Sequence, residues 1–388
     1  FLKAQKLLKG TNLLQAHIIN VGLKSFLSFL PFIAFAVFSH SGRSEFNDFS
    51  YFFSIFNIFY GFVGLPIYQF ILVNSNNGIF TTFFDLNNRL NISYRLFLLL
   101  FAFIFAFFGI SEVCIAIISI IYSIQIASCA CFSRKDNFYY EILSNISFFL
   151  SLSVLINIIS YSSIIPFLIS SALSVAISIR AFNLKNSISK YLKLDSIELK
   201  MIFPYFIISA LGSLIAYGDM ILAVKLLNAN EAYKYIWLNR AILGSTILCI
   251  AFSNLLMSDK NNLLDRNRRI KLTLTSIFTA LVMFLIAIFV LRVILDSDFT
   301  EEIFYILLLI VILKYLTIFP SITLVHKGLQ NLRIYSTIAA SFFYALTIII
   351  NMAIFDFNLW SLINAVLVYH LSIYLFNTFF SYKKKLNH

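Results

Sequence analysis

Charged residues are scarce in this chain: they make up 12% of its 388 residues, whereas 60% of the residues are hydrophobic. A soluble domain keeps roughly a quarter of its residues charged to solvate its surface. Proline is also rare, with 5 residues, and the mean hydropathy is +0.90. The composition therefore excludes both an ordinary soluble domain and a disordered or low-complexity chain.

Sequence motifs of nucleotide hydrolysis and metal chemistry are missing as well. The chain has no G-x-x-x-x-G-K-[ST], no H-E-x-x-H and no pair of C-x-x-C motifs. Its cysteines lie in or at the ends of apolar runs and are interpreted as packing residues: Cys114, Cys129, Cys131 and Cys249. We expect no metal, no cofactor, no catalytic residue and no enzymatic activity.

Long apolar runs are abundant instead. A bilayer core of about 30 Å needs about 20 apolar residues per helix, and twelve runs meet this requirement. The sequence therefore predicts an all-α polytopic membrane protein with about twelve transmembrane helices. The expected spans are 13–38, 49–73, 92–109, 113–132, 141–159, 164–182, 202–227, 235–256, 272–294, 303–325, 334–355 and 359–380.

The distribution of lysine and arginine predicts the orientation of these spans. Most of the 29 basic residues fall on one side when the N-terminus is placed in the cytoplasm, and acidic residues cluster in the opposite loop at 296–302. Basic loops stay in the cytoplasm. We therefore expect an inner-membrane protein with both termini in the cytoplasm. The net charge of +12 is then a topology signal and does not indicate a nucleic-acid partner.

The longest polar interruption, at 183–201, follows the sixth expected span. It divides the chain into an N-terminal six-helix lobe at 1–182, a cytoplasmic linker at 183–201, and a C-terminal six-helix lobe at 202–388 with a basic tail. Six is an even number, so both lobes share one orientation, as parallel repeats about an axis along the membrane normal do.

Five ionisable side chains inside the expected spans are the candidate functional residues: Lys24, Asp219, Lys225, Arg240 and Lys314. A charge at the bilayer centre costs roughly 2.5–3.5 kcal/mol even on lenient scales, so such residues are functional by default. Two structural alternatives remain open. Lys225 lies near the end of its span and could reach the headgroups, and Asp219 could pair with Arg240 on the next helix.

Four cations against one anion indicate an anionic cargo such as a phosphate or pyrophosphate group. We expect Lys24 and Lys314, about halfway along their spans, to line a hydrated cavity with a positive field. His17 and His370 also fall inside spans, where a hydrogen bond to a neighbouring helix is favoured over a proton relay.

Three segments resemble the polysaccharide flippases of the MOP superfamily, specifically the O-antigen translocases. SEFNDFSYFFSIFNIFYGFVGLP at 44–66 is similar to the family's loop of an acidic residue and an aromatic leading into a helix that ends in Gly-Leu-Pro. FPYFIISALGSLIAYGDMILAVKLLNANEAYKYIWLNRAI at 203–242 is similar to its Asp-containing seventh helix and the loop that follows. NLRIYSTIAASFFYALTIIIN at 331–351 is similar to the segment where the second half closes.

The resemblance implies a MATE-like fold of two lobes around a cationic central cavity. It implies a cargo of undecaprenyl-pyrophosphate-linked oligosaccharide, moved from the cytoplasmic to the periplasmic leaflet by alternating access. Lys24 and the other basic groups would meet the pyrophosphate, and Asp219 falls at the family's seventh-helix acid. The partners would be this lipid-linked glycan, membrane lipids and other O-antigen assembly proteins, namely a polymerase and a chain-length regulator. Lys24 alone would supply an intramembrane charge from the first lobe.

Two other functions compete with a flippase. A multidrug exporter of the same superfamily, coupled to Na⁺ or H⁺, needs intramembrane carboxylates, and Asp219 is the one carboxylate in the expected spans that could serve. An O-antigen polymerase-type enzyme keeps its catalytic residues in long outer loops, but the longest outer loop expected here has about ten residues, at 40–49. The flippase interpretation is favoured over both.

Overall fold

The computed structural model describes residues 43–74, 109–133, 138–159, 164–183, 199–246 and 301–383, together with separate positions between 274 and 289. Nine continuous helices lie in these described ranges. They are α3 (Arg43–Asn74), α6 (Ile110–Ser133), α7 (Phe138–Ile158), α8 (Ile165–Asn183), α9 (Leu199–Leu226), α10 (Ala229–Ser245), α13 (Glu301–His326), α14 (Gln330–Ile354) and α15 (Leu359–Lys383).

Each of these helices overlaps one of the expected spans. The span at 13–38 lies outside the described residues, that at 92–109 lies outside them except for its last residue, and that at 272–294 lies mostly outside them, so a total of twelve stays a prediction. Within the described part, four segments are long and apolar enough to cross a membrane: Tyr205–Leu226, Glu301–Val325, Gln330–Ile354 and Leu359–Tyr382.

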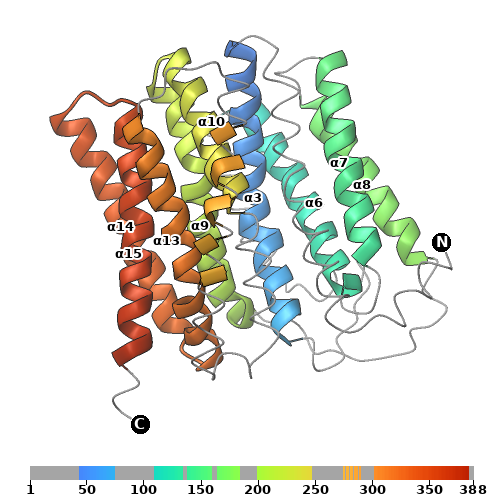
Figure 1. The fold of residues 1–388 in the computed structure, drawn as a ribbon. Coiled ribbons are helices and arrows are strands. Elements are labelled where there is room, and N and C mark those ends of the chain that lie inside the picture. The colour runs from blue at the N-terminus through green and yellow to red at the C-terminus, as the bar shows by residue number, and fades with distance from the viewer. Residues whose placement is uncertain are drawn as a thin grey trace.

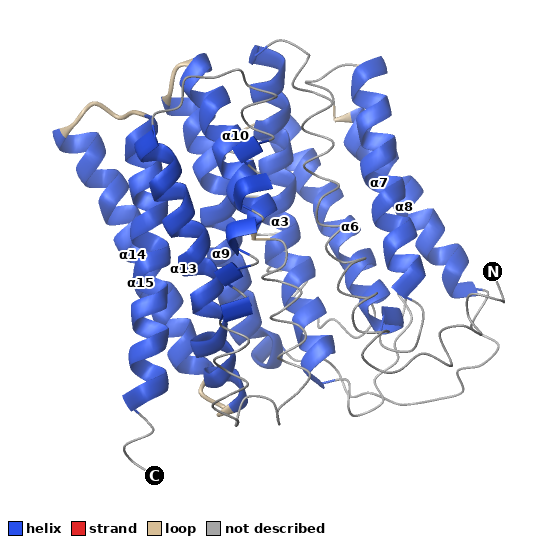
Figure 2. Ribbon diagram, viewed as in Figure 1, coloured by secondary structure: helices blue, strands red, loops and turns tan. Residues whose placement is uncertain are grey.

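The helices run side by side, and the described elements are helices joined by loops and turns (Figures 1 and 2). Helix α3 packs along α9, and α10 contacts both of them. Helices α6, α7 and α8 lie beyond α3, whereas α13, α14 and α15 lie on the other side, next to α9 and α10 (Figure 1). The centre of the bundle is therefore where α3, from the first half of the sequence, meets α9 and α10 from the second.

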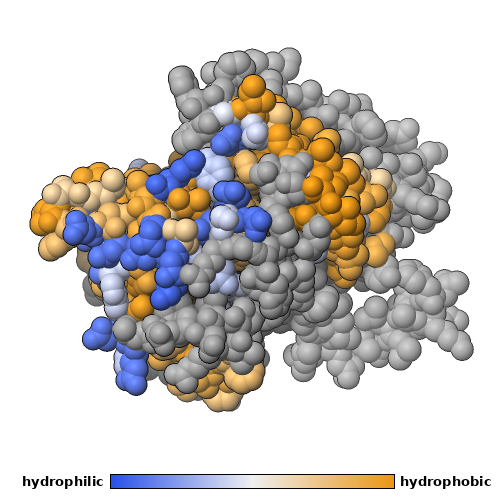
Figure 3. All heavy atoms as spheres, turned by 90° about the horizontal axis from the view of Figure 1, so that it is seen from above, coloured by the Kyte–Doolittle hydropathy of each residue, from blue (hydrophilic) through white to orange (hydrophobic). Residues whose placement is uncertain are grey.

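The outward faces of the helices are apolar, as a protein surrounded by lipid requires. On α14, Phe342 and Ile349 are exposed, whereas Thr337, Tyr344 and Ile348 are buried at helical spacing. Hydrophilic residues gather instead at the end of the bundle where α3 begins, with hydrophobic residues around them (Figure 3). An apolar flank with a polar end indicates a multi-pass membrane protein.

Two short turns keep neighbouring helices adjacent. At the α9–α10 turn, Asn228 accepts from the backbone N–H of Glu231 (2.9 Å) and donates from Nδ2 to its carboxylate (2.9 Å), which caps α10. At the α13–α14 turn, Gly328 has φ +69, a left-handed conformation that favours glycine. Because both turns are this short, α10 must lie against α9 and α14 close to α13.

Helices α3 and α9 approach each other closely at Gly61. A Cβ placed on Gly61 would stand 1.6 Å from Oγ and 2.3 Å from Cβ of Ser213. Ser213 is itself buried. Two membrane helices pack this tightly only where small residues face each other.

We expect Gly61→Ala to lower the free energy of unfolding by about 1–3 kcal/mol, the usual cost of overpacking. The double variant Gly61→Ala/Ser213→Gly should recover most of this loss, because it removes the side chain that the new methyl group meets. Thermal unfolding of the purified protein in detergent measures both. A single variant as stable as the wild type would show that α3 and α9 are not in contact at this point.

Candidate functional site

Asp219 lies at the centre of the bundle, where α9 packs against α10. Its side chain is 1% exposed. Its Oδ2 atom accepts a hydrogen bond from the hydroxyl of Tyr235 (2.5 Å) and another from Nδ2 of Asn239 (3.0 Å). Tyr235 and Asn239 are one turn apart on α10 and so share one face of that helix. The carboxylate is therefore held by two neutral donors from the neighbouring helix.

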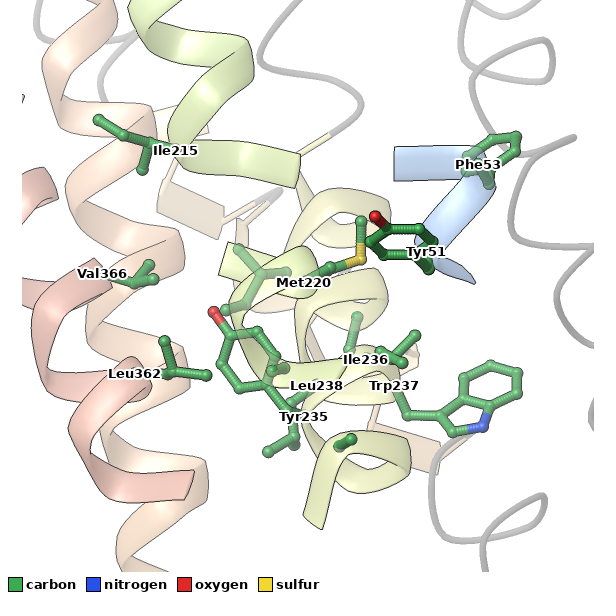
Figure 4. Close-up of a cluster of buried hydrophobic side chains, with 14 of the residues drawn as sticks. Tyr51, Phe53, Ile215, Met220, Tyr235, Ile236, Trp237, Leu238, Leu362 and Val366 are labelled. Carbon is green, nitrogen blue, oxygen red and sulfur yellow. The ribbon is translucent and has the colours of Figure 1, made fainter. Parts of the chain in front are cut away.

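The aromatic residues around this contact come from several helices. In Figure 4, Tyr235 and Trp237 point to opposite sides of α10, Tyr235 toward Leu362 of α15. On the other side, Trp237 stacks on Phe46 of α3, with ring centroids 5.5 Å apart. Helix α10 therefore lies between α3 of the first half of the sequence and α15 of the second half.

Arg240, the next residue of α10 after Asn239, is 3% exposed. Its guanidinium lies over the ring of Phe53 in α3 (5.0 Å to the centroid) and near that of Tyr217 in α9 (5.6 Å). A cation over an aromatic face is attracted by the ring quadrupole, more strongly when both are desolvated. The hydrogen bonds that Asp219 Oδ2 accepts come from Tyr235 and Asn239, and the Arg240 guanidinium lies within electrostatic range of the same carboxylate.

Lys314 lies on α13 and is half-buried. Its charge is within electrostatic range of both Asp219 and His370. The neighbouring residue Tyr315 fixes α13 against α10, because its hydroxyl donates to the carbonyl of Ser245 (3.0 Å). Lys314 therefore belongs to the same electrostatic environment as Asp219.

Lys225 has a different position, in the last turn of α9, where its side chain is exposed. Its ammonium lies 4.6 Å from the ring centroid of Tyr51 in α3. The Tyr51 hydroxyl in turn donates to Oε1 of Glu112 at the start of α6 (3.1 Å). Lys225 thus contacts the first half of the chain at the end of the bundle.

Further contacts join the halves at this end. Nδ2 of Asn47 in α3 donates to the carbonyl of Ala229, the first residue of α10 (3.1 Å). Phe46 packs edge-on against Tyr233 (5.0 Å between centroids), in addition to its stacking on Trp237. We call these contacts of Phe46 and Asn47 with α10 the α3–α10 clasp. The clasp holds the start of α3 against the start of α10.

The expected site residues thus separate into two groups. Asp219, Arg240 and Lys314 come from α9, α10 and α13, three helices that contact one another through α10. Lys225 lies at the end of α9, and Lys24 lies outside the described residues. Within the described part of the chain, no group of three metal-ligating side chains is close enough to hold a metal ion.

Sequence reasoning missed the immediate partners of these charges. Tyr235 and Asn239 are not among the residues that the sequence singles out, although their spacing of four residues beside a buried acid is the pattern that a two-donor clamp requires. Phe53 carries no such signal, because nothing in the sequence shows that it faces Arg240 across 187 residues.

No protein-family model matches the chain, and no similar sequence is found among curated proteins. Solved structures are similar in fold. An inward-facing multidrug resistance MATE family transporter of the MOP superfamily is 12% identical, with a TM-score of 0.61 over 95% of this chain and 99% of that one. A MATE structure in the bent conformation is 12% identical, with a TM-score of 0.57 over 96% and 94%. The eukaryotic MATE transporter AtDTX14 is 16% identical, with a TM-score of 0.51 over 94% and 93%.

Identities this low show the fold alone. The chain is a multi-pass α-helical membrane protein with the fold of the MATE transporters of the MOP superfamily.

Proposed function

We propose that the chain is a flippase that moves undecaprenyl-pyrophosphate-linked O-antigen oligosaccharide units from the cytoplasmic to the periplasmic leaflet of the inner membrane. Two six-helix lobes, 1–182 and 202–388, alternate between two states around a cationic cavity. The similarity to MATE transporters and the family resemblance of 44–66, 203–242 and 331–351 support a carrier of this type.

The buried position of Arg240 is the observation that most supports the proposal. It is buried at the point where α3 of the first half meets α9 and α10 of the second. Interfaces between the repeats are where carriers of this architecture bind their substrates. A planar guanidinium binds phosphate oxygens in pairs, which suits a pyrophosphate.

Charge balance supports an anionic cargo. Asp219 and Arg240 are the two charged side chains that are fully buried among the described residues, and half-buried Lys314 adds a second cation nearby. Lys24 would contribute a further cation from the first lobe. A surplus of positive charge in a low-dielectric environment attracts a negatively charged group strongly.

An ion-coupled multidrug exporter is the second candidate, and Asp219 favours it. A buried carboxylate between a tyrosine hydroxyl and an amide is a position at which a proton or a small cation could bind and leave. In that function Asp219 would be the essential residue, and the cations would serve to position it.

Removing the Lys314 side chain distinguishes the flippase function from the exporter function. We expect Lys314→Ala to abolish surface glycan in the host cell, while lipid-linked oligosaccharide accumulates and the amount of protein in the membrane is unchanged. Lys225→Ala, which removes a cation from the exposed end of α9, is the matched control and should leave surface glycan nearly normal.

Immunoblots of surface glycan and drug-susceptibility tests, made on the same strains, read out both functions. If cells without the chain keep full surface glycan but become sensitive to cationic drugs, the flippase proposal is wrong and the exporter is favoured.

A further inference from the structure

Asn57 lies on the face of α3 that meets the second half of the chain. One turn before it, Phe53 lies under the guanidinium of Arg240 (5.0 Å to the ring centroid). One turn after it, Gly61 lies against Ser213 of α9. Residues four positions apart share one face of a helix. Asn57 therefore lies between these two contacts, on the side of α3 that faces α9 and α10.

Tyr217 is the residue of α9 that lies at the level of Asn57. Helices α3 and α9 run antiparallel, as the contacts between them toward both ends show. Asn57 precedes Gly61 by four residues. Tyr217 follows Ser213, the residue that Gly61 meets, by four residues as well, so both lie one turn from this contact in the same direction. The Tyr217 ring is also close to the Arg240 guanidinium (5.6 Å to the centroid). Asn57, Tyr217 and Arg240 therefore lie together where the two halves meet.

The Asn57 side chain is half-buried, whereas Phe53 and Gly61 on the same face are buried. Its Nδ2 donates to the carbonyl of Phe53 (2.7 Å), and within the described ranges no hydrogen bond to Oδ1 is formed. Asn57 lies eight residues, or ~12 Å, inside the expected span 49–73. Polar groups inside the membrane face the bundle interior or a water-filled cavity and not lipid. Oδ1 is therefore an accessible hydrogen-bond acceptor at the interface of the two halves.

We propose that Asn57 binds the first sugar of the cargo, the one attached to the diphosphate that Arg240 binds. This inference rests on the proposed function, in which the cargo is a lipid-linked oligosaccharide. A sugar presents several hydroxyl donors, and an amide oxygen with two lone pairs accepts from them. Tyr217 forms the opposite wall of this sugar subsite.

The spacing along α3 fits this division of roles. Phe53, over which the Arg240 guanidinium lies, and Asn57 are four residues apart, or ~6 Å along the helix axis. A diphosphate at Arg240 therefore places the sugar bonded to it about one turn away, beside Asn57. A polyprenyl diphosphate without sugar would contact Arg240 but offer no sugar hydroxyl to Asn57. Asn57 thus recognises the sugar and Arg240 the diphosphate.

Binding to the purified full-length chain in detergent tests the subsite with two probes. One is undecaprenyl diphosphate, and the other is undecaprenyl diphosphate that carries the oligosaccharide of the host cell. We expect the wild type to bind the glycan-carrying lipid more tightly than the sugar-free lipid. Asn57→Ala should weaken binding of the glycan-carrying lipid by about three- to tenfold, the usual effect of a lost hydrogen bond. Binding of the sugar-free lipid should be unchanged.

Three further variants complete the experiment. Arg240→Met should weaken binding of both lipids, because both carry the diphosphate. Asn351→Ala is the matched control and should bind both lipids as the wild type does, since Asn351 donates to its own helix in the same way (Thr347 carbonyl, 2.9 Å) but lies on α14. Asn57→Leu, which keeps much of the side-chain volume without the amide, replaces Asn57→Ala if that variant fails to fold.

The outcomes separate this inference from the proposed function. If the wild type binds neither lipid, the flippase proposal is wrong and the subsite is wrong with it. If the wild type binds both lipids equally well, or if the Asn57 variants bind the glycan-carrying lipid as the wild type does, the sugar subsite alone is disproved. Equal weakening of both lipids by the Asn57 variants, or loss of glycan binding in Asn351→Ala, also disproves it. Loss of affinity confined to the glycan-carrying lipid and to the Asn57 variants is the result that supports it.

Discussion

Replacing Arg240 by methionine is expected to slow transport strongly while the protein still folds. Methionine fills much of the same space against Phe53 and Tyr217 and is accommodated in irregular cores. Because it removes the charge but little of the packing, it isolates the role of the guanidinium. Interactions made by a charged donor contribute about 1.5–3 kcal/mol, so the transport rate should fall roughly 10- to 100-fold.

Arg240→Lys is the informative companion. Lysine keeps the positive charge but not the planar fork or its stacking on rings. A cargo held by two phosphate oxygens should be transported poorly by this variant, whereas a purely electrostatic role would leave most of the activity. Transport in the methionine variant at the wild-type rate, with equal protein in the membrane, would exclude Arg240 from the transport site.

A disulfide across the α3–α10 clasp is expected to stop transport completely. The Asn47 side chain reaches the Ala229 carbonyl at 3.1 Å, so Asn47→Cys and Ala229→Cys should bring two thiols together in a background without the native cysteines. In alternating access the cargo passes only if the two halves separate at each end in turn. A covalent bond at the clasp would prevent opening at this end.

Reduction of the disulfide gives the control within the same protein. We expect oxidation to reduce transport to the background level and dithiothreitol to restore it, with each single-cysteine variant insensitive to both reagents. Formation of the bond is followed by a change of mobility on gels without reductant. Full transport by the oxidised double variant would mean that the clasp stays closed throughout the cycle.

The sequence predicted the helices well because a single physical requirement determines them. Every apolar run long enough to cross a bilayer must satisfy its backbone hydrogen bonds internally, and a helix does so. The observed helix Glu301–His326 begins two residues before the expected span 303–325 and ends one residue after it. Two helices begin well before their expected spans. Helix α3 was expected at 49–73 and begins at Arg43. Helix α10 was expected at 235–256 and begins at Ala229, because Asn228 and Glu231 cap it earlier than hydrophobicity alone indicates.

Partners across the bundle could not be predicted in the same way. Asp219 and Arg240 stand out in a sequence because charge is rare in an apolar run, but their contacts depend on how α9, α10 and α3 are rotated about their axes. Each successive residue of a helix points about 100° further around the helix axis. Asn239 therefore faces Asp219, while Arg240 faces Phe53, and only the packed structure separates the two.

Translocation by the purified chain in proteoliposomes is the most direct test of the central claim that it carries a lipid-linked anionic glycan. A fluorescent undecaprenyl-diphosphate oligosaccharide in both leaflets is exposed to a quencher that cannot cross the membrane. We predict that wild-type protein lets the quencher reach nearly all of the fluorophore, whereas protein-free vesicles and the Arg240→Met variant keep about half of it protected. Half-protection with the wild-type protein, together with ion-driven uptake of a cationic dye by the same vesicles, would contradict the flippase and identify an exporter.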